Sequence, residues 1–183
     1  MSAWEGLTPP YSTIVADPPW HYEQGGPHSL TGRPKAVDVP PYSTMTVDDV
    51  ALLPVEQIAR PSAHLYLWTT NRYLRDAYDV AEAWGFTPSQ VLTWCKAPHG
   101  LGPGGAFANT TEFCLFARRN CAHRQRMDST WWEWPRAAHS VKPAAFFDMV
   151  EQVSPGPYVE LFARQPRLGW DHWGHGYEMG GAA

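Results

Sequence analysis

The features of a secreted, membrane-spanning or disulfide-bonded protein are missing from this sequence. Only three cysteines occur, Cys95, Cys114 and Cys121, and none of them forms the CxxC spacing of a zinc or redox site. No basic start is followed by the apolar stretch of a signal peptide, and no run reaches the roughly 18 to 20 apolar residues of a membrane span. We therefore expect a cytoplasmic protein without structural disulfides and without a membrane segment.

Positive charge is also scarce. The chain has 14 lysines and arginines against 18 aspartates and glutamates, so its formal net charge is −4. Such a chain does not attract a polyanion through its global field, and contact with nucleic acid requires a local basic patch. Internal repeats and linker-like stretches are missing as well, and 183 residues suit one well-buried domain. We expect residues 1–183 to form a single domain.

Proline and tryptophan, by contrast, are abundant, with 18 and 10 residues. One stretch combines both: in IVADPPW, Ile14 to Trp20, an apolar run leads directly into a carboxylate, two prolines and an indole. Proline has no N–H to donate to a sheet, so the strand must end at Asp17. This carboxylate is therefore expected at the carboxyl end of a strand, where open α/β sheets bind their ligands.

Apolar patterns predict strands that alternate with helices, which is typical of an α/β protein with a doubly wound, mainly parallel sheet. We expect strands over residues 13–16, 64–69, 91–96, 112–117 and 158–163, and helices after Thr46 and over residues 71–85 and 142–153. Residues 21–41 are rich in glycine and proline and follow no period. Long irregular segments in compact domains usually bind ligands, so we expect a mobile active-site loop here.

The residues Asp17, Pro18, Pro19 and Trp20 suit the methylation of an exocyclic amine. The prolines remove two N–H groups, which leaves carbonyl acceptors without competing donors. Asp17 and one carbonyl could each accept a hydrogen from an NH₂ group while Trp20 stacks on the attached ring. Acceptors that pull the nitrogen toward sp³ geometry localise its lone pair, which lowers the barrier to attack on an electrophilic methyl group. The alternative is a tight turn in which Asp17 caps the following segment.

The DPPW motif and the distal stretch HSVKPAAFFDMVEQVSPGPYVELFARQPRLGWDHWG together resemble the MT-A70 family of S-adenosylmethionine-dependent amino-methyltransferases. The resemblance extends from about Tyr11 to about Gly176. The family includes the eukaryotic mRNA N6-adenosine methyltransferases, the Ime4-like proteins, and bacterial and phage DNA adenine methylases. It implies a Rossmann-like methyltransferase fold, S-adenosyl-L-methionine as the cofactor, and a circularly permuted order in which the catalytic motif precedes the cofactor motif.

The resemblance also implies a set of cofactor-binding residues. Lys142 would hold the carboxylate of the cofactor, and Arg164, at the end of the last expected strand, would reach its ribose. Because a charged Glu160 inside an apolar strand is costly without a partner, we expect it to pair with Lys142. The implied residues are Asp17, Lys142, Glu160, Leu161, Phe162 and Arg164.

For substrate binding the resemblance implies Trp20, Tyr42, Asn109 and Glu112. Tyr42 would lie close to the target base, and Asn109 and Glu112 would brace the active-site loops. An ordinary loop is the alternative at these positions. His175 stands where family members commonly have asparagine or aspartate, and we assign it no role.

The substrate that we expect is the N6 amine of adenine in DNA, although the chemistry of the motif alone also fits cytosine N4. Alternatives are RNA or a free nucleotide, or a noncatalytic nucleic-acid-binding partner of an active methyltransferase. Residues 118–126, RRNCAHRQR, and the run Trp131 to Trp134 either combine phosphate-binding charge with stacking surface or form a solvated loop. The catalytic fold uses nearly the whole chain, so target recognition would be short or supplied by a partner in a homodimer or heterodimer.

Overall fold

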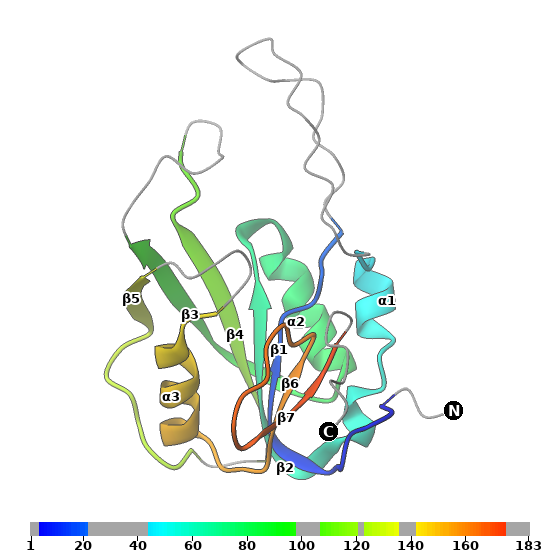
Figure 1. The fold of residues 1–183 in the computed structure, drawn as a ribbon. Coiled ribbons are helices and arrows are strands. Elements are labelled where there is room, and N and C mark those ends of the chain that lie inside the picture. Colours follow the sequence, from blue (N-terminus) through cyan, green and yellow to red (C-terminus); the bar gives the residue numbers. More distant parts are fainter. Residues whose placement is uncertain (1–3, 22–43, 98–106, 121–122, 136–141, 175–183) are drawn as a thin grey trace, which may run out of the picture.

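The computed structural model describes residues 4–21, 44–97, 107–120, 123–135 and 142–174 (Figure 1). All but one residue of the loop expected over residues 21–41 lies outside the described residues, as do Tyr42 and His175. Within the described ranges, no helix is long and apolar enough to cross a membrane.

A seven-stranded sheet with the order β5-β3-β4-β2-β1-β6-β7 organises these residues. The strands are β1 (Tyr11–Ala16), β2 (Ala59–Thr69), β3 (Thr87–Ala97), β4 (Thr111–Arg119), β5 (Trp131–Pro135), β6 (Tyr158–Leu161) and β7 (Trp170–Trp173). β1 runs parallel to β2 and to β6, and the pairs β6–β7 and β3–β5 are parallel too. β4 is antiparallel to its neighbours β2 and β3. The prediction of a mainly parallel sheet is therefore confirmed.

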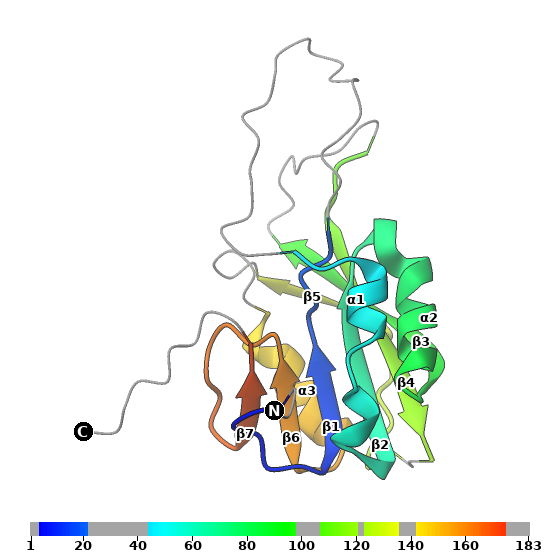
Figure 2. The same cartoon turned by 90° about the vertical axis from the view of Figure 1, so that its right-hand side faces the viewer.

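Helices cover both faces of the sheet, as Figure 2 shows. They are α1 (Val47–Ala51), α2 (Leu74–Ala83) and α3 (Ala144–Val153). Successive side chains of β1 enter different cores, because strand residues point alternately to opposite faces. Ile14 packs with Leu65 in the core under α1 and α2, whereas Val15 packs with Tyr66 and Phe146 in the core under α3. A strand buried on both faces has an unbroken apolar sequence, which explains the run that precedes Asp17.

The two edge strands β5 and β7 were not predicted. Exposed and half-buried residues alternate along β5, where Trp132 and Trp134 turn inward and Trp131 is exposed. This run was expected to be a loop or a stacking surface, whereas it pairs with β3. β7 pairs with β6, where no element was expected. Both strands are short and rich in tryptophan and charged or polar residues, so no apolar run marks them in the sequence.

β6 ends at Leu161, two residues earlier than expected, because the chain turns sharply at the next residue. Phe162 has a φ of 63°, in the left-handed region that residues other than glycine seldom adopt. The end of β7 holds this turn, since the N–H of Ala163 donates to the carbonyl of Trp173 at 3.1 Å. Gly174 passes so close that a Cβ there would lie 2.9 Å from both N and O of Ala163. β7 thus fixes the direction in which the chain leaves β6.

Substitution of Gly174 is expected to disturb this turn. Gly174→Ala would force two backbone segments apart, and overpacking of this kind typically costs about 1–3 kcal/mol. Urea unfolding should therefore give a lower free energy of unfolding than for the wild type. Asp79→Ala, at an exposed position of α2, should change it by less than about 0.5 kcal/mol. Equal stability of Gly174→Ala and the wild type would contradict the close approach.

Candidate active site

The DPPW segment forms a tight turn at the carboxyl edge of the sheet. Asp17 directly follows β1, and its N–H donates to the last carbonyl of β6 at 3.4 Å. The carbonyl of Pro18 accepts from the N–H of Trp20 at 2.8 Å, and that of Pro19 accepts from the N–H of Met45 at 2.8 Å. Each carbonyl keeps a second lone pair. The turn and a role in binding an amine are therefore compatible interpretations of these residues.

Trp20 is part of the core in this structure. Its side chain is 4% exposed, its Nε1 donates to the carbonyl of Trp68 at 3.1 Å, and its ring stacks on Tyr73 with a centroid distance of 5.4 Å. These contacts cover one face of the indole and anchor the end of the turn. Stacking of Trp20 on a base stays a prediction, and the observed contacts also give it the task of holding the DPPW turn.

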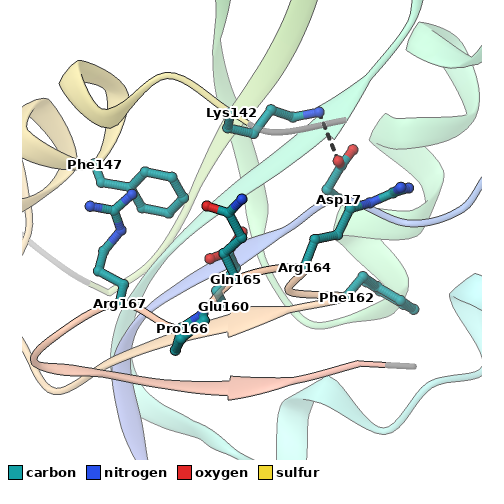
Figure 3. A pocket seen from close by; sticks show the side chains of 9 residues that line it. All are labelled: Asp17, Lys142, Phe147, Glu160, Phe162, Arg164, Gln165, Pro166 and Arg167. Carbon is teal, nitrogen blue, oxygen red and sulfur yellow. Dashed lines mark hydrogen bonds and ion pairs between the residues drawn. The ribbon is translucent and has the colours of Figure 1, made fainter. Parts of the chain in front are cut away.

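Lys142, two residues before α3, lies against Asp17 (Figure 3). Its Nζ donates to Oδ2 of Asp17 at 2.7 Å and to Oε2 of Glu112 at 3.5 Å. The same Nζ lies 4.8 Å from the ring centroid of Trp68. Only 8% of the Lys142 side chain is exposed. Although burial lowers the pKa of the ammonium group, Asp17 and then Glu112 outweigh it and raise the pKa above its usual value. The group therefore stays charged.

A second lysine completes this chain of charges. Lys96 of β3 forms an ion pair with Oε1 of Glu112, which lies on the neighbouring strand β4. Burial alone would raise the pKa of Glu112, yet Lys142 and Lys96 together hold it below its usual value. Lys96 was not predicted at the site, because the strands were expected to form a mainly parallel sheet. Antiparallel pairing of Trp94 with Glu112 is what brings Lys96 into reach.

The expected pair of Glu160 and Lys142 is wrong. In the described part of the chain, Lys142 forms its ion pairs with Asp17 and Glu112 instead. Burial, and then the charge of Asp17, raise the pKa of Glu160 to about 7, and Arg167 and Lys142 only partly offset this rise. Glu160 therefore changes its charge near neutral pH.

A pocket opens between these groups and the segment that follows β6. Figure 3 shows Asp17, Lys142 and Arg164 toward one side and Arg167 beside Phe147 toward the other. The lining residues are Asp17, Lys142, Phe147, Glu160, Phe162, Arg164, Gln165, Pro166 and Arg167. Five of these were expected to form the site. Phe147 and residues 165–167 were missed, because a helical phenylalanine and a loop after a strand carry no distinctive signal in one sequence.

Leu161 and Asn109, which were also expected at the site, do not line this pocket. The side chain of Leu161 is fully buried in the core under α1 and α2, so only its backbone reaches the edge, where its carbonyl accepts from Asp17. Asn109 is exposed ahead of β4, and its role in bracing loops stays a prediction. Among the described residues, no cluster of three histidine, cysteine, aspartate or glutamate side chains is placed to hold a metal ion.

The ion pair of Lys96 with Glu112 should affect how the free energy of unfolding changes as the pH falls. Glu112 has a pKa below its unfolded value of 4.5, so its stabilisation is present above about pH 4.5 and is lost as the pH falls through the folded pKa. Lys96→Met removes one of two cations, so the variant should be less stable near neutral pH and should lose less stability on acidification. Urea unfolding over a pH series measures both effects. Lys96→Arg should behave like the wild type, and parallel curves for Lys96→Met and the wild type would contradict the network.

Glu160 should have the opposite effect on the pH dependence of the free energy of unfolding. Its folded pKa of about 7 exceeds the unfolded value of 4.5, so the wild type loses stability as the pH rises from about 4.5 to about 7. Glu160→Gln cannot ionise and should gain stability relative to the wild type over this interval, with a constant difference above it. Thermal or urea unfolding against pH tests this, and a difference that does not vary with pH would contradict the raised pKa.

The sequence is similar to those of known methyltransferases. The MT-A70 family model matches residues 11–176. The chain is 29% identical over 182 residues to the Type II methyltransferase M.MunI of a Mycoplasma species, which covers 90% of this chain and 76% of that protein. It is 26% identical over 165 residues to the human N(6)-adenosine-methyltransferase catalytic subunit METTL3, covering 84% of this chain and 26% of that one.

A noncatalytic protein is also among the relatives. The chain is 27% identical over 146 residues to the N(6)-adenosine-methyltransferase non-catalytic subunit METTL14 of Xenopus tropicalis, covering 68% of this chain and 32% of that one. The chain thus spans only about a quarter to a third of these two eukaryotic relatives. With the family model matching almost the whole chain, and with the expected motifs meeting at one edge of a mainly parallel sheet, this protein belongs to the MT-A70 family of methyltransferases.

Proposed function

We propose that this protein transfers a methyl group from S-adenosyl-L-methionine to the exocyclic N6 amine of adenine in DNA. The observation that carries the proposal is the ion pair of Asp17 and Lys142 at the mouth of the DPPW turn. Lys142 occupies Oδ2 of Asp17, and Oδ1 accepts no hydrogen bond from the described residues. A carboxylate oxygen with a fixed direction is thus left for a substrate amine.

The pocket beside Asp17 fits the cofactor. It contains the cationic guanidinium of Arg167, whose buried Nε has no hydrogen-bond partner among the described residues. It also contains the carboxyl group of Glu160, which has a pKa of about 7. Phe147 and Phe162 add apolar surface. Such a mixture suits a ligand with a zwitterionic amino-acid end, hydroxyl groups and a heterocycle. When bound there, S-adenosyl-L-methionine supplies an electrophilic methyl group on its sulfonium.

We assign the activation of the amine to three residues of the DPPW turn and to Lys142. Asp17 accepts a hydrogen bond from the NH₂ group, and this bond strengthens as the nitrogen becomes pyramidal and gains positive charge. The carbonyls of Pro18 and Pro19 are fixed by backbone hydrogen bonds and offer their second lone pairs close by. Lys142 orients the carboxylate and, because its pKa is raised, does not itself serve as a base near neutral pH.

The remaining roles are proposed from position. Glu160, Phe162 and Arg164 would hold the cofactor at the carboxyl end of β6, with the backbone of Leu161 alongside. Glu112 would position Lys142, which in turn orients Asp17. Trp20 would hold the DPPW turn in place through its packing, whether or not it also contacts the base. Tyr42 and Asn109 keep the substrate-side roles that the resemblance implies.

DNA is proposed as the substrate because the bacterial Type II methyltransferase matches this chain over most of both lengths, and the family resemblance includes bacterial DNA adenine methylases. The name of METTL3 supports adenine N6 and keeps RNA as an alternative. The name of METTL14 supports a second candidate, a noncatalytic nucleic-acid-binding partner. The Asp17–Lys142 pair favours catalysis over that role. A homodimer or heterodimer stays a proposal.

Asp17→Ala should abolish methyl transfer while most of the affinity for the cofactor survives, since the contact of Asp17 with the amine is strongest in the transition state and is expressed in kcat. Mass spectrometry of nucleosides from DNA, RNA and free nucleotides incubated with the protein gives the product, and calorimetry with S-adenosylhomocysteine gives the affinity. The expected product is N6-methyladenine in DNA, with Asp79→Ala as an active control.

The possible failures of this experiment are separable. Undiminished turnover of Asp17→Ala would refute the mechanism. N4-methylcytosine, or methylated RNA, as the sole product would refute the substrate. Cofactor binding without any product from the wild type would favour the noncatalytic role.

A further inference from the structure

The guanidinium group of Arg167 is held in an unusual position for a loop residue. It lies over the ring of Phe147 on α3, with Cζ 3.7 Å from the ring centroid, and it lines the pocket. Its Nε is buried and has no hydrogen-bond partner in the described part of the chain. Stacking on an aromatic ring fixes the plane of the guanidinium while its N–H groups remain available at the edge.

A buried N–H group without an acceptor destabilises a folded protein. A ligand or a water molecule is therefore expected to accept its hydrogen bond. Burial raises the pKa of Glu160 and the charge of Arg167 partly offsets this rise, yet no ion pair joins the two side chains among the described residues. The acceptor that Arg167 lacks therefore has to come from outside the described chain. A planar fork of N–H groups is best matched by a carboxylate or a phosphate.

The family resemblance implies that Lys142 binds the carboxylate of the cofactor, but in this structure Lys142 already forms ion pairs within the protein. Its ammonium donates to Asp17 and Glu112, and its side chain is only 8% exposed. These contacts use two of the three N–H groups of the ammonium, so a ligand carboxylate would have to reach the remaining one on a side chain that is almost wholly buried. Displacing Asp17 instead would separate a buried pair, which leaves an uncompensated charge and is strongly unfavourable.

We propose that Arg167, stacked on Phe147, binds the α-carboxylate of the methionine part of S-adenosyl-L-methionine, and that Lys142 serves Asp17 instead. The inference rests on the proposed function, because it assumes this cofactor in this pocket. The charges of both Arg167 and Asp17 act on Glu160, which lines the same pocket, and its carboxyl group complements the α-ammonium of the same ligand end. Opposite charges on neighbouring residues thus match the zwitterion.

The test compares two ligands that differ only in this carboxylate: S-adenosylhomocysteine and decarboxylated S-adenosylhomocysteine. Titration calorimetry measures the affinity of each for the wild type and for Arg167→Met, in which the apolar stem over Phe147 is largely kept. We expect Arg167→Met to bind S-adenosylhomocysteine about tenfold to a hundredfold more weakly and the decarboxylated ligand within about twofold of the wild type. Arg75→Met, at an exposed position of α2, should bind both ligands as the wild type does.

Lys142→Met and Arg167→Lys sharpen the comparison. Under the proposal, Lys142→Met shows no loss that is specific to the carboxylate-bearing ligand, and Arg167→Lys retains part of the affinity because it keeps the charge but not the fork. Thermal unfolding confirms that each variant is folded.

Three results would overturn this inference alone. The Arg167→Met variant could bind both ligands equally weakly, which would mean a structural role. It could bind both as the wild type does, or Lys142→Met could show the carboxylate-specific loss instead. In each of these three cases, wild-type binding of S-adenosylhomocysteine would leave the proposed function standing. A wild type that binds neither ligand would overturn the proposed function, and this inference with it.

Discussion

The candidate site depends on the ion pairs that the buried ammonium group of Lys142 forms with two carboxylates. Its carboxylate partners come from distant parts of the chain, Asp17 after β1 and Glu112 in β4, while Lys142 itself is placed by the start of α3. A charge in such surroundings is tolerated only when it is paired and hydrogen-bonded. The ion pairs of Lys142 therefore require β1, β4 and the start of α3 to be assembled together. The site is a property of the tertiary structure and not of any one motif.

The parallel pairing of β1 with β6 supplies the second constraint. Ala16 pairs with Leu161, so the residues that follow the two strands leave the sheet side by side. This pairing unites a motif near the beginning of the chain with one near its end, as the permuted order implied. The left-handed turn at Phe162, held by β7, then carries residues 164–167 into the pocket lining rather than onward along the sheet. Strain in such a turn persists only where the surrounding structure fixes it.

Much of this architecture could be predicted from local signals. An apolar run ended by Asp17 and two prolines identifies a buried strand and its end. The helix expected after Thr46 is α1, and Thr46 forms a capping box with Asp49 at its start. The pairing of Lys142 could not be predicted, because its choice between Asp17 and Glu160 depends on the direction of side chains across three elements. Lys96 was hidden for a similar reason, since one antiparallel strand within a parallel sheet leaves no mark on the sequence. Trp20 was read from its aromatic character alone, whereas its burial depends on Tyr73 and Trp68.

The energetic cost of the Lys142 cluster also bears on what the site is for. Replacing buried ion pairs with apolar residues is often neutral or stabilising, so stability alone does not explain a lysine buried between two carboxylates. Lys142 is turned inward and Lys96 is engaged by Glu112, so these two lysines do not offer exposed cations to a nucleic acid. Groups with shifted pKa values that line a pocket, as Lys142 and Glu160 do here, are instead more typical of functional sites. The cluster is understandable if its task is to hold one carboxylate oxygen of Asp17 so that the other points at a reacting amine.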